Sequence, residues 1–182
     1  NLRVSYNGER QLFYFLVKYA NPKIVPWVHS VMYFNLFDDA GGAYKHDDFS
    51  EHREFLLKQM REGRRVAYFP ETAYWIAFDN SVPTYLPLYV YSRWIDMKRL
   101  RDAAEAGGFS PLREHVVFSS GWEWGYWQND YASLRMNYTL PDDWRDISSE
   151  MFEPLGRTGR TAAESAIMLA EIQHEFLIEK RL

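Results

Sequence analysis

The feature that most constrains the fold is an alternation of apolar runs with helical segments. Three runs rich in Val, Ile, Phe and Tyr, at 23–37, 64–69 and 113–118, start about 40–50 residues apart. Segments with helical periodicity separate them, at 48–62 and 89–106. Strands that alternate with helices pair in parallel, so the sequence predicts an α/β fold built from βαβ units.

The first run, 23–37, is long and almost continuously apolar. This is typical of a strand that is buried on both faces of a parallel sheet. His29 lies inside the run. We predict it to be a hydrogen-bonded core residue, with a ligand role as the alternative.

The helix at 48–62 has recognisable ends and an inner face. Asp48, followed three residues later by Glu51, resembles a capping box, and Gly63 is typical of a helix stop. The apolar spacing predicts an inner face, which consists of Phe49, Leu56 and Met60.

The two ends of the chain read differently from the middle. At the N-terminus the pattern predicts a strand at 2–6, a turn at Asn7-Gly8 and a helix at 9–19. The Pro- and Gly-containing segment 140–160 reads as a connection over the surface. Thr161 and Glu164 then form a capping-box pattern that opens a last helix within 161–182.

The last helix is apolar on two faces, so we expect another part of its own chain, or another subunit, to pack on it. We interpret 1–182 as a single α/β domain that is a fragment of a larger chain. Its βα units occupy 1–139, before the connection at 140–160.

Composition excludes several classes of protein. The formal net charge is -4, with 25 acidic and 21 basic residues, which argues against a nucleic-acid partner. The only dense basic runs, at 98–101 and 157–160, read as solvated helix or loop positions. No cysteine is present, so disulfides, thiolate metal sites and cysteine nucleophiles are excluded. No apolar run reaches the roughly 18 residues that a transmembrane helix needs, so we expect no transmembrane segment.

Aromatic residues make up 18% of the chain, and they gather in two stretches. Residues 64–79 read RRVAYFPETAYWIAFD, and residues 115–131 read HVVFSSGWEWGYWQNDY. Each stretch is a strand-like run followed by a glutamate among aromatic side chains. Because functional groups gather at the carboxyl ends of parallel strands, we expect Glu71 and Glu123 to meet at one rim.

A pair of carboxyl groups suits glycoside hydrolysis, in which one donates a proton and the other acts as a base or nucleophile. Tryptophans around Glu123 would desolvate it and favour the neutral, proton-donating form, with Glu71 as its partner. The assignment of the two roles stays open. The structural alternative is that Glu123 caps a helix or pairs with an arginine such as Arg93.

Flat aromatic rings in the same stretches are suited to contact with sugar rings. The alternative is that they pack in a core or an interface, to which we assign Trp94 and Trp144. The predicted substrate-binding residues are Tyr74, Trp75, Asp79, Trp122, Trp124, Tyr126, Trp127 and Asp130.

We expect no cofactor, with a divalent metal as the alternative. Histidine and carboxylate ligands for such an ion lie between residues 38 and 52, but their spacing matches no ligand signature. The candidate ligands are Asp38, Asp39, His46 and Asp47, together with Asp48 and His52.

The segments VAYFPE and VVFSSGWEWG resemble the rim of a (β/α)-barrel glycoside hydrolase, where strands end in a catalytic glutamate flanked by tryptophan. The resemblance covers roughly residues 23–138 and implies a barrel, carbohydrate substrates, an extracellular or periplasmic location, and Glu71 and Glu123 as the acid/base pair. An eight-unit barrel needs about 250 residues, so the chain would be part of a (β/α)8 (TIM-type) barrel. The alternative is a small open α/β sheet.

The sequence therefore predicts a carbohydrate-active hydrolase that acts on an oligo- or polysaccharide. Three other classes stay open: a non-catalytic glycan-binding domain, a structural or interaction domain with an aromatic interface, and a metal-dependent hydrolase built on the loop at 46–52.

Overall fold

The computed structural model describes residues 2–72, 85–118 and 123–180, except for the side chains of Glu123 and Trp124. The described residues form a mixed α/β fold with two small sheets, which confirms the predicted class. A parallel sheet has the order β3-β4-β5, and a separate antiparallel hairpin pairs β1 with β2. The strands are β1 (Arg3–Tyr6), β2 (Glu9–Leu12), β3 (Trp27–Ser30), β4 (Ala67–Pro70) and β5 (Glu114–His115).

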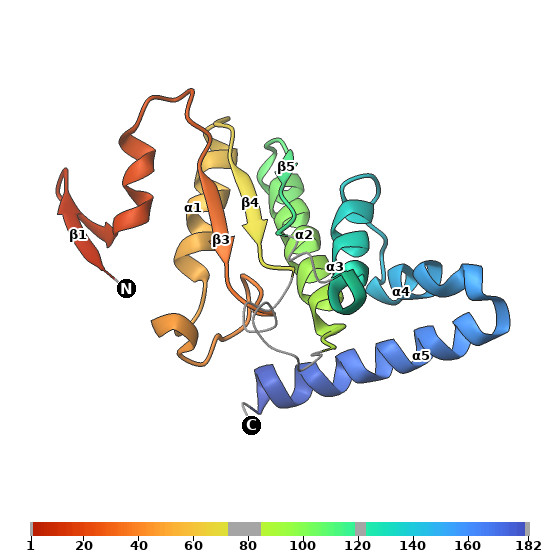
Figure 1. Ribbon diagram of the computed structural model, residues 1–182. Coiled ribbons are helices and arrows are strands. Elements are labelled where there is room, and N and C mark those ends of the chain that lie inside the picture. Colours follow the sequence, from red (N-terminus) through yellow and green to blue (C-terminus); the bar gives the residue numbers. More distant parts are fainter. Residues whose placement is uncertain (1, 73–84, 119–122, 181–182) are drawn as a thin grey trace.

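Helices connect and surround the parallel strands (Figure 1). Helix α1 leads from β3 to β4 and α2 leads from β4 to β5, as the alternation predicts. The α-helices are α1 (Ser50–Arg61), α2 (Leu88–Gly107), α3 (Glu123–Met136), α4 (Trp144–Phe152) and α5 (Gly156–Gln173). Shorter segments are η1 (Phe13–Tyr19), η2 (Ala43–Lys45), η4 (Glu153–Leu155) and the π-helical η5 (His174–Glu179).

The parallel sheet has one covered face and one open face. Val28 and Tyr68 are buried in the main core, and the helices α1 and α2 pack on that side. Figure 1 views the sheet from the other side, with β3 and β4 in front of α1. On this open side Trp27 is 60% exposed. The prediction that the strand within 23–37 is buried on both faces is therefore wrong. The connections β3–α1–β4 and β4–α2–β5 advance across the sheet in the same direction. Because such connections are right-handed, they place both helices on the same face.

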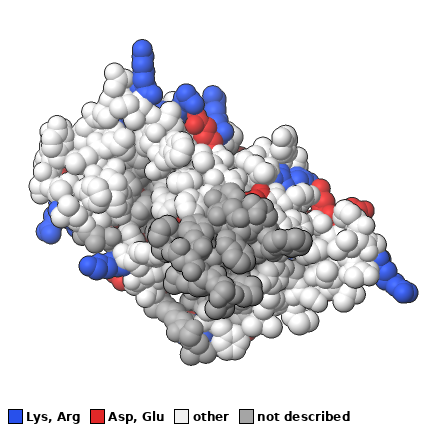
Figure 2. Space-filling model, in the orientation of Figure 1, with Lys and Arg blue, Asp and Glu red and all other residues white. Residues whose placement is uncertain are grey.

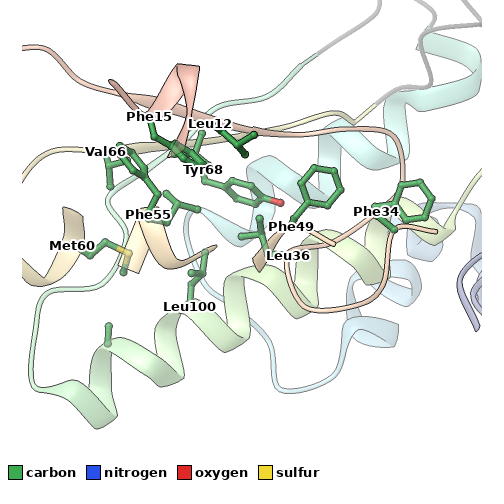
Figure 3. Close-up of a cluster of buried hydrophobic side chains, with 14 of the residues drawn as sticks. Leu12, Phe15, Phe34, Leu36, Phe49, Phe55, Met60, Val66, Tyr68 and Leu100 are labelled. Carbon is green, nitrogen blue, oxygen red and sulfur yellow. The ribbon is translucent and has the colours of Figure 1, made fainter. Parts of the chain in front are cut away.

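The main core lies between the sheet and α1 (Figure 3). Phe49, Leu56 and Met60 are buried there, which confirms the predicted inner face of α1. Phe15 and Phe55 stack with ring centroids 4.8 Å apart, and this contact joins η1 to α1. The core thus ties the N-terminal segment to the first βαβ unit.

The helix ends follow local chemistry only in part. Gly63 has a φ of +69°, and it ends α1 where the sequence predicts a stop. At the start of α1, Asp48 accepts hydrogen bonds from the backbone and hydroxyl of Ser50, so the predicted capping box with Glu51 is replaced by a tighter turn. Glu51 pairs with Arg3 of β1 instead.

The N-terminal helix predicted at 9–19 is wrong. Asn7 and Gly8 have φ values of 50° and 80°, which make a tight hairpin turn that pairs Glu9 with Tyr6. This pairing carries the chain into β2, and only Phe13–Tyr19 becomes helical, as the 3-10 segment η1. The turn chemistry therefore outweighs the helical spacing of the apolar residues.

The surface connection predicted at 140–160 is also wrong. Helix α4 buries Trp144, Ile147 and Met151 in a second core with α2 and α3, and Asp143 caps it by accepting from Arg145 N at 3.0 Å. Helix α5 already begins at Gly156, so the predicted capping box at 161–164 lies inside it. In the part of the chain that the structure describes, no helix is long and apolar enough to cross a bilayer.

A buried polar network around Arg93 joins α2 to the ends of β3 and β4. Arg93 and Asp96 are fully buried, with Nη2 of Arg93 3.4 Å from Oδ2 of Asp96. Asp96 also accepts hydrogen bonds from Tyr68 Oη at 2.5 Å and from Leu36 N at 2.7 Å. The network therefore fixes the loop after β3 against β4.

The same arginine reaches three further groups. Its guanidinium donates to the Phe34 carbonyl, to Ser30 Oγ at 3.2 Å and to the Glu71 carbonyl at 3.4 Å. Arg93 thus contacts the last residue of β3 and the first residue after β4. Burial raises the pKa of Asp96 to about 6, and the charge of Arg93 opposes this increase.

Replacing Arg93 with Met should destabilise the fold by about 3 kcal/mol at pH 7, because it leaves the Asp96 carboxylate buried without its counter-charge. Losing Arg93 raises the pKa of Asp96 further above its ordinary value of 3.8. A raised folded-state pKa adds stability below the unfolded-state value and loses it as pH rises through the folded-state value. The loss of unfolding free energy caused by Arg93→Met should therefore be about 1 kcal/mol smaller at pH 5 than at pH 7. Urea unfolding of wild type and variant at both pH values measures it.

The matched control is Arg65→Met, which removes an exposed ion pair with Glu114 of 2.7 Å. It should change the unfolding free energy by less than about 0.5 kcal/mol at either pH. An Arg93→Met deficit no larger than that of the control would contradict the role given to the network.

Candidate functional site at the carboxyl edge of the sheet

Glu71 lies at the carboxyl end of the central strand, where the sequence predicts a functional rim. It follows Pro70 directly, and its backbone continues the pairing of the sheet. Its N–H donates to Ser30 O at 3.1 Å, and a parallel bridge joins it to Phe118 beyond β5. The position of Glu71 is thus set by both neighbouring strands.

Two groups contact the oxygens of the Glu71 carboxyl group. Met32 N–H donates to Oε2 at 2.5 Å, and His29 Nε2 lies 3.3 Å from Oε1. Glu71 is only 7% exposed, while the His29 side chain is 37% exposed. The carboxyl group is therefore buried and fixed in orientation, while the histidine side chain is partly exposed.

The backbone of Met32 adopts an uncommon conformation at this site. Its φ of 54° is in the left-handed region, which a residue with a long side chain rarely adopts. The same residue presents its N–H to Glu71. Strained backbone of this kind persists where the surroundings enforce it, and it concentrates at functional sites.

The hydrogen bonds of His29 determine where its protons lie. Nδ1 is 2.8 Å from Phe69 O, and a carbonyl oxygen can only accept, so Nδ1 carries a hydrogen. Nε2 of the same ring lies 3.3 Å from the Glu71 carboxyl group. We call these two residues at the rim the His29–Glu71 pair.

Helix α3 is fastened to the residue after Glu71. Thr72 is fully buried, and its hydroxyl lies 2.5 Å from Phe118 O and 2.7 Å from Asp130 Oδ1. Asn129 Nδ2 donates to Thr72 O at 2.9 Å. Asn129 and Asp130, which are consecutive in α3, thus both hydrogen-bond to Thr72, and these contacts fix the helix relative to Glu71.

Aromatic rings cover the open face of the sheet beside the pair. Phe69 lies 5.3 Å from both Trp27 and His29, centroid to centroid, and 5.7 Å from Phe118. We call Trp27, Phe69 and Phe118 the aromatic platform. Figure 2 shows this side of the molecule, where charged side chains gather toward the edges and most of the described surface between them is uncharged.

The structure places three of the predicted substrate-binding residues in contact with other parts of the fold. Tyr126 is 2% exposed and packs edge-on against Tyr89 at 6.3 Å, so it has a packing position and does not form an open wall. Trp127 is half-exposed and contacts Phe152 of α4 at 6.0 Å. Asp130 holds Thr72, as described above.

The other predicted residues lie outside the described part of the chain. They are Tyr74, Trp75, Asp79 and Trp122, together with the side chains of Glu123 and Trp124. The backbone of Glu123 is the first residue of α3.

The candidate metal ligands serve other contacts. Asp38 accepts from Asn35 and lies 3.4 Å from His174 Nε2, whose hydrogen bond lowers the pKa of Asp38. Asp39 accepts from Gly41 N, and His46 stacks on Phe49. Asp47 is exposed, and its backbone carbonyl accepts from Ala40 N. Within residues 2–72, 85–118 and 123–180, no group of three potential ligands is arranged to hold a metal ion.

Sequence reasoning gave His29 a ligand role only as an alternative, and it missed Met32 and Trp27 as parts of the site. The available signal was the alternation of large and small residues in the strand, since Trp27 and His29 alternate with Val28 and Ser30. The left-handed backbone of Met32 leaves no mark in the sequence.

Comparisons with known proteins identify no relative of this chain. No family model matches it, and no curated protein and no solved structure is significantly similar to it.

Replacing Thr72 with Val should loosen the attachment of α3, because the shape is kept while the hydroxyl between Asp130 and Phe118 is lost. Losing this buried hydrogen bond should cost about 1–3 kcal/mol in chemical denaturation. Hydrogen exchange of the α3 amides should also accelerate. The exposed Thr158→Val on α5 is the control and should cost less than about 0.5 kcal/mol. Equal stabilities of the two variants would contradict the attachment.

Proposed function

We propose that the protein is a carbohydrate-active hydrolase in which Glu71 acts as nucleophile or base and Glu123 as the acid. The observation that carries the proposal is the Glu71 carboxyl group, held by His29 and Met32 at the carboxyl end of β4. A fixed carboxyl group at this edge of a parallel sheet is the arrangement on which hydrolases of this class depend.

The contacts of Glu71 support its assignment as the nucleophile or base. Met32 donates a hydrogen bond to one oxygen, and His29 Nε2 lies 3.3 Å from the other. A carboxyl group that accepts hydrogen bonds in this way is suited to attack a sugar carbon or to take a proton from water. The proton donor is then a second group, and Glu123 is the candidate from the sequence.

The attachment of α3 supports Glu123 as that second group. Position 123 precedes Asp130 by seven residues, which is two helical turns, so both positions lie on the same side of α3. Asp130 contacts Thr72, the residue next to Glu71. Position 123 is therefore on the side of α3 that contacts the rim through Asp130.

The aromatic platform supports a sugar as the substrate. Trp27 is 60% exposed, and its ring borders Phe69, which in turn borders His29. Sugar rings present flat C–H surfaces that pack on such rings, and no charged residue belongs to the platform. A glycan bound there would lie beside the His29–Glu71 pair.

The sheet also bears on the larger fold of this class. Parallel strands with helices on one face and large side chains on the other resemble a section of a (β/α)8 barrel wall. In a closed barrel that inner face would be a packed core, so the accessible aromatic platform belongs to the alternative, a small open α/β sheet.

Trp27 also favours a second candidate, a glycan-binding domain without hydrolysis. An exposed indole on an uncharged face binds sugars without needing a catalytic group. This candidate predicts affinity for a glycan that is lost in Trp27→Ala and unchanged in Glu71→Gln.

The test of the proposed function is the release of reducing sugar from a panel of oligo- and polysaccharides. On the glycan that wild type cleaves best, Glu71→Gln should lower turnover about 10³-fold or more, because an amide can neither attack nor take up the proton. Glu114→Gln is the control. It removes an exposed contact with Arg65 at the opposite end of the sheet, and its turnover should equal that of wild type.

Unimpaired turnover in the double variant Glu71→Gln/Glu123→Gln would contradict the proposed function. If wild type cleaves no glycan of the panel but binds one through Trp27, the glycan-binding candidate replaces it.

A further inference from the structure

The amino edge of the parallel sheet, opposite the rim, carries a cavity of about 110 Å³. Two loops form its walls, 63–66 between α1 and β4 and 110–113 between α2 and β5, and they lie side by side because β4 and β5 are paired (Figure 1). Gly63, Arg65 and Arg113 are exposed, so the cavity opens to solvent. Its volume is below the roughly 300 Å³ at which sites for drug-sized ligands begin, so it fits a small ion and not a ring compound.

Three guanidinium groups line this cavity. Arg64 and Arg65 come from the loop before β4, and Arg113 comes from the loop before β5. Among the described lining residues Glu114 is the only carboxylate, and its Oε1 already accepts from Nε of Arg65 at 2.7 Å. The lining therefore keeps an excess of positive charge, in a chain whose formal net charge is -4.

Arg64 is the cation that gains most from a counter-charge. Its side chain is partly buried, and Nη1 donates to the Lys18 carbonyl at 2.8 Å. No carboxylate of the described residues lies within ion-pair distance of it. A partly buried charge interacts with a nearby ion more strongly than an exposed one, because less water lies between the two. An anion in the cavity would therefore stabilise Arg64 through its charge, without direct contact with the buried Nε and Nη2.

Arg65 and Arg113 supply the donors that an ion in the cavity can reach. Arg113 is exposed and forms no ion pair or hydrogen bond with the described residues. The side chain of Arg65 is 71% exposed, and its printed contact engages Nε alone, which leaves the two terminal nitrogens. The planar fork of a guanidinium group matches the oxygens of a phosphate group and can bind two of them at once.

Capping of the neighbouring helix ends does not account for these arginines. At the end of α1, the carbonyl oxygens of Gln59 and Met60 accept from backbone N–H groups at 2.9 and 3.0 Å. At the end of α2, those of Ala104 and Glu105 accept from backbone N–H groups at 3.1 and 3.2 Å. The backbone itself therefore satisfies these helix ends, and the guanidinium groups stay directed to other partners.

We propose that the cavity at the amino edge binds a phosphate group, either free phosphate or the phosphate of a larger molecule that extends into solvent. Arg65 and Arg113 bind its oxygens, and the charge of Arg64 adds to the attraction. Ser110 contributes an exposed hydroxyl to the same lining. The proposal does not depend on the proposed function, because the site lies at the other edge of the sheet from Glu71 and its test measures binding alone.

The test is calorimetric titration of the whole protein at low salt and neutral pH. Inorganic phosphate should bind as one ion per chain, and its affinity should fall as sodium chloride is added. Trimethyl phosphate, which has the same tetrahedral centre without the charge, should not bind. Phenyl phosphate separates the two sources: an affinity equal to that of phosphate assigns the site to the free ion, and a higher affinity assigns it to the phosphate of a larger molecule.

Variants with opposite effects locate the ion in the cavity. Arg113→Gln should weaken phosphate binding about tenfold or more, because it removes a charge-assisted contact. Glu114→Gln should strengthen it about threefold or more, because it removes the opposing charge and releases Arg65. Since a misfolded protein does not bind more tightly, the second variant separates the proposal from a loss of structure.

The matched control is Arg10→Gln, which makes the same charge change in the exposed part of β2, away from the cavity, and should keep wild-type affinity. Any of three results would overturn the proposal. They are no saturable binding of phosphate or phenyl phosphate, wild-type affinity in Arg113→Gln, or an affinity in Glu114→Gln that is unchanged or lower.

Discussion

The buried pair of Arg93 and Asp96 is the interaction on which the rest of the structure depends. Through it, α2 reaches the end of β3, the end of β4 and the loop at 31–38 at the same time. Charges in such a position cost more to bury than to leave in water, so their value lies in the geometry they impose. That geometry includes the left-handed turn at Met32, which points a backbone N–H at Glu71.

The site therefore follows from the packing in a short chain of causes. Strand β3 ends at Ser30 and the chain turns at Met32, so one donor and His29 converge on the first residue after β4. Thr72, the next residue, is hydrogen-bonded to Asn129 and Asp130 of α3. Because both crossover helices lie on one face, the other face is left to Trp27, Phe69 and Phe118, beside the fixed carboxyl group.

Part of this was predictable from the sequence. The parallel βαβ order, the strand ending at Pro70-Glu71, and the inner face of α1 follow from apolar periodicity and turn residues, and all are seen in the structure. The helix expected at 9–19 failed because the turn at Asn7-Gly8 forces a hairpin, and α4 was missed because Pro and Gly near it suggested a connection. The role of His29 was hidden because its partners lie 40 and 42 residues away, at Phe69 and Glu71, and depend on strand register.

The most direct test of the central claim, that Glu71 and Glu123 act as a pair, is an experimental structure that defines both carboxyl groups. The account predicts that they face each other across an open cleft, about 5–10 Å apart, with the shorter distance meaning retention of configuration and the longer one inversion. A much larger separation, or a Glu123 carboxyl group buried against an arginine, would contradict it.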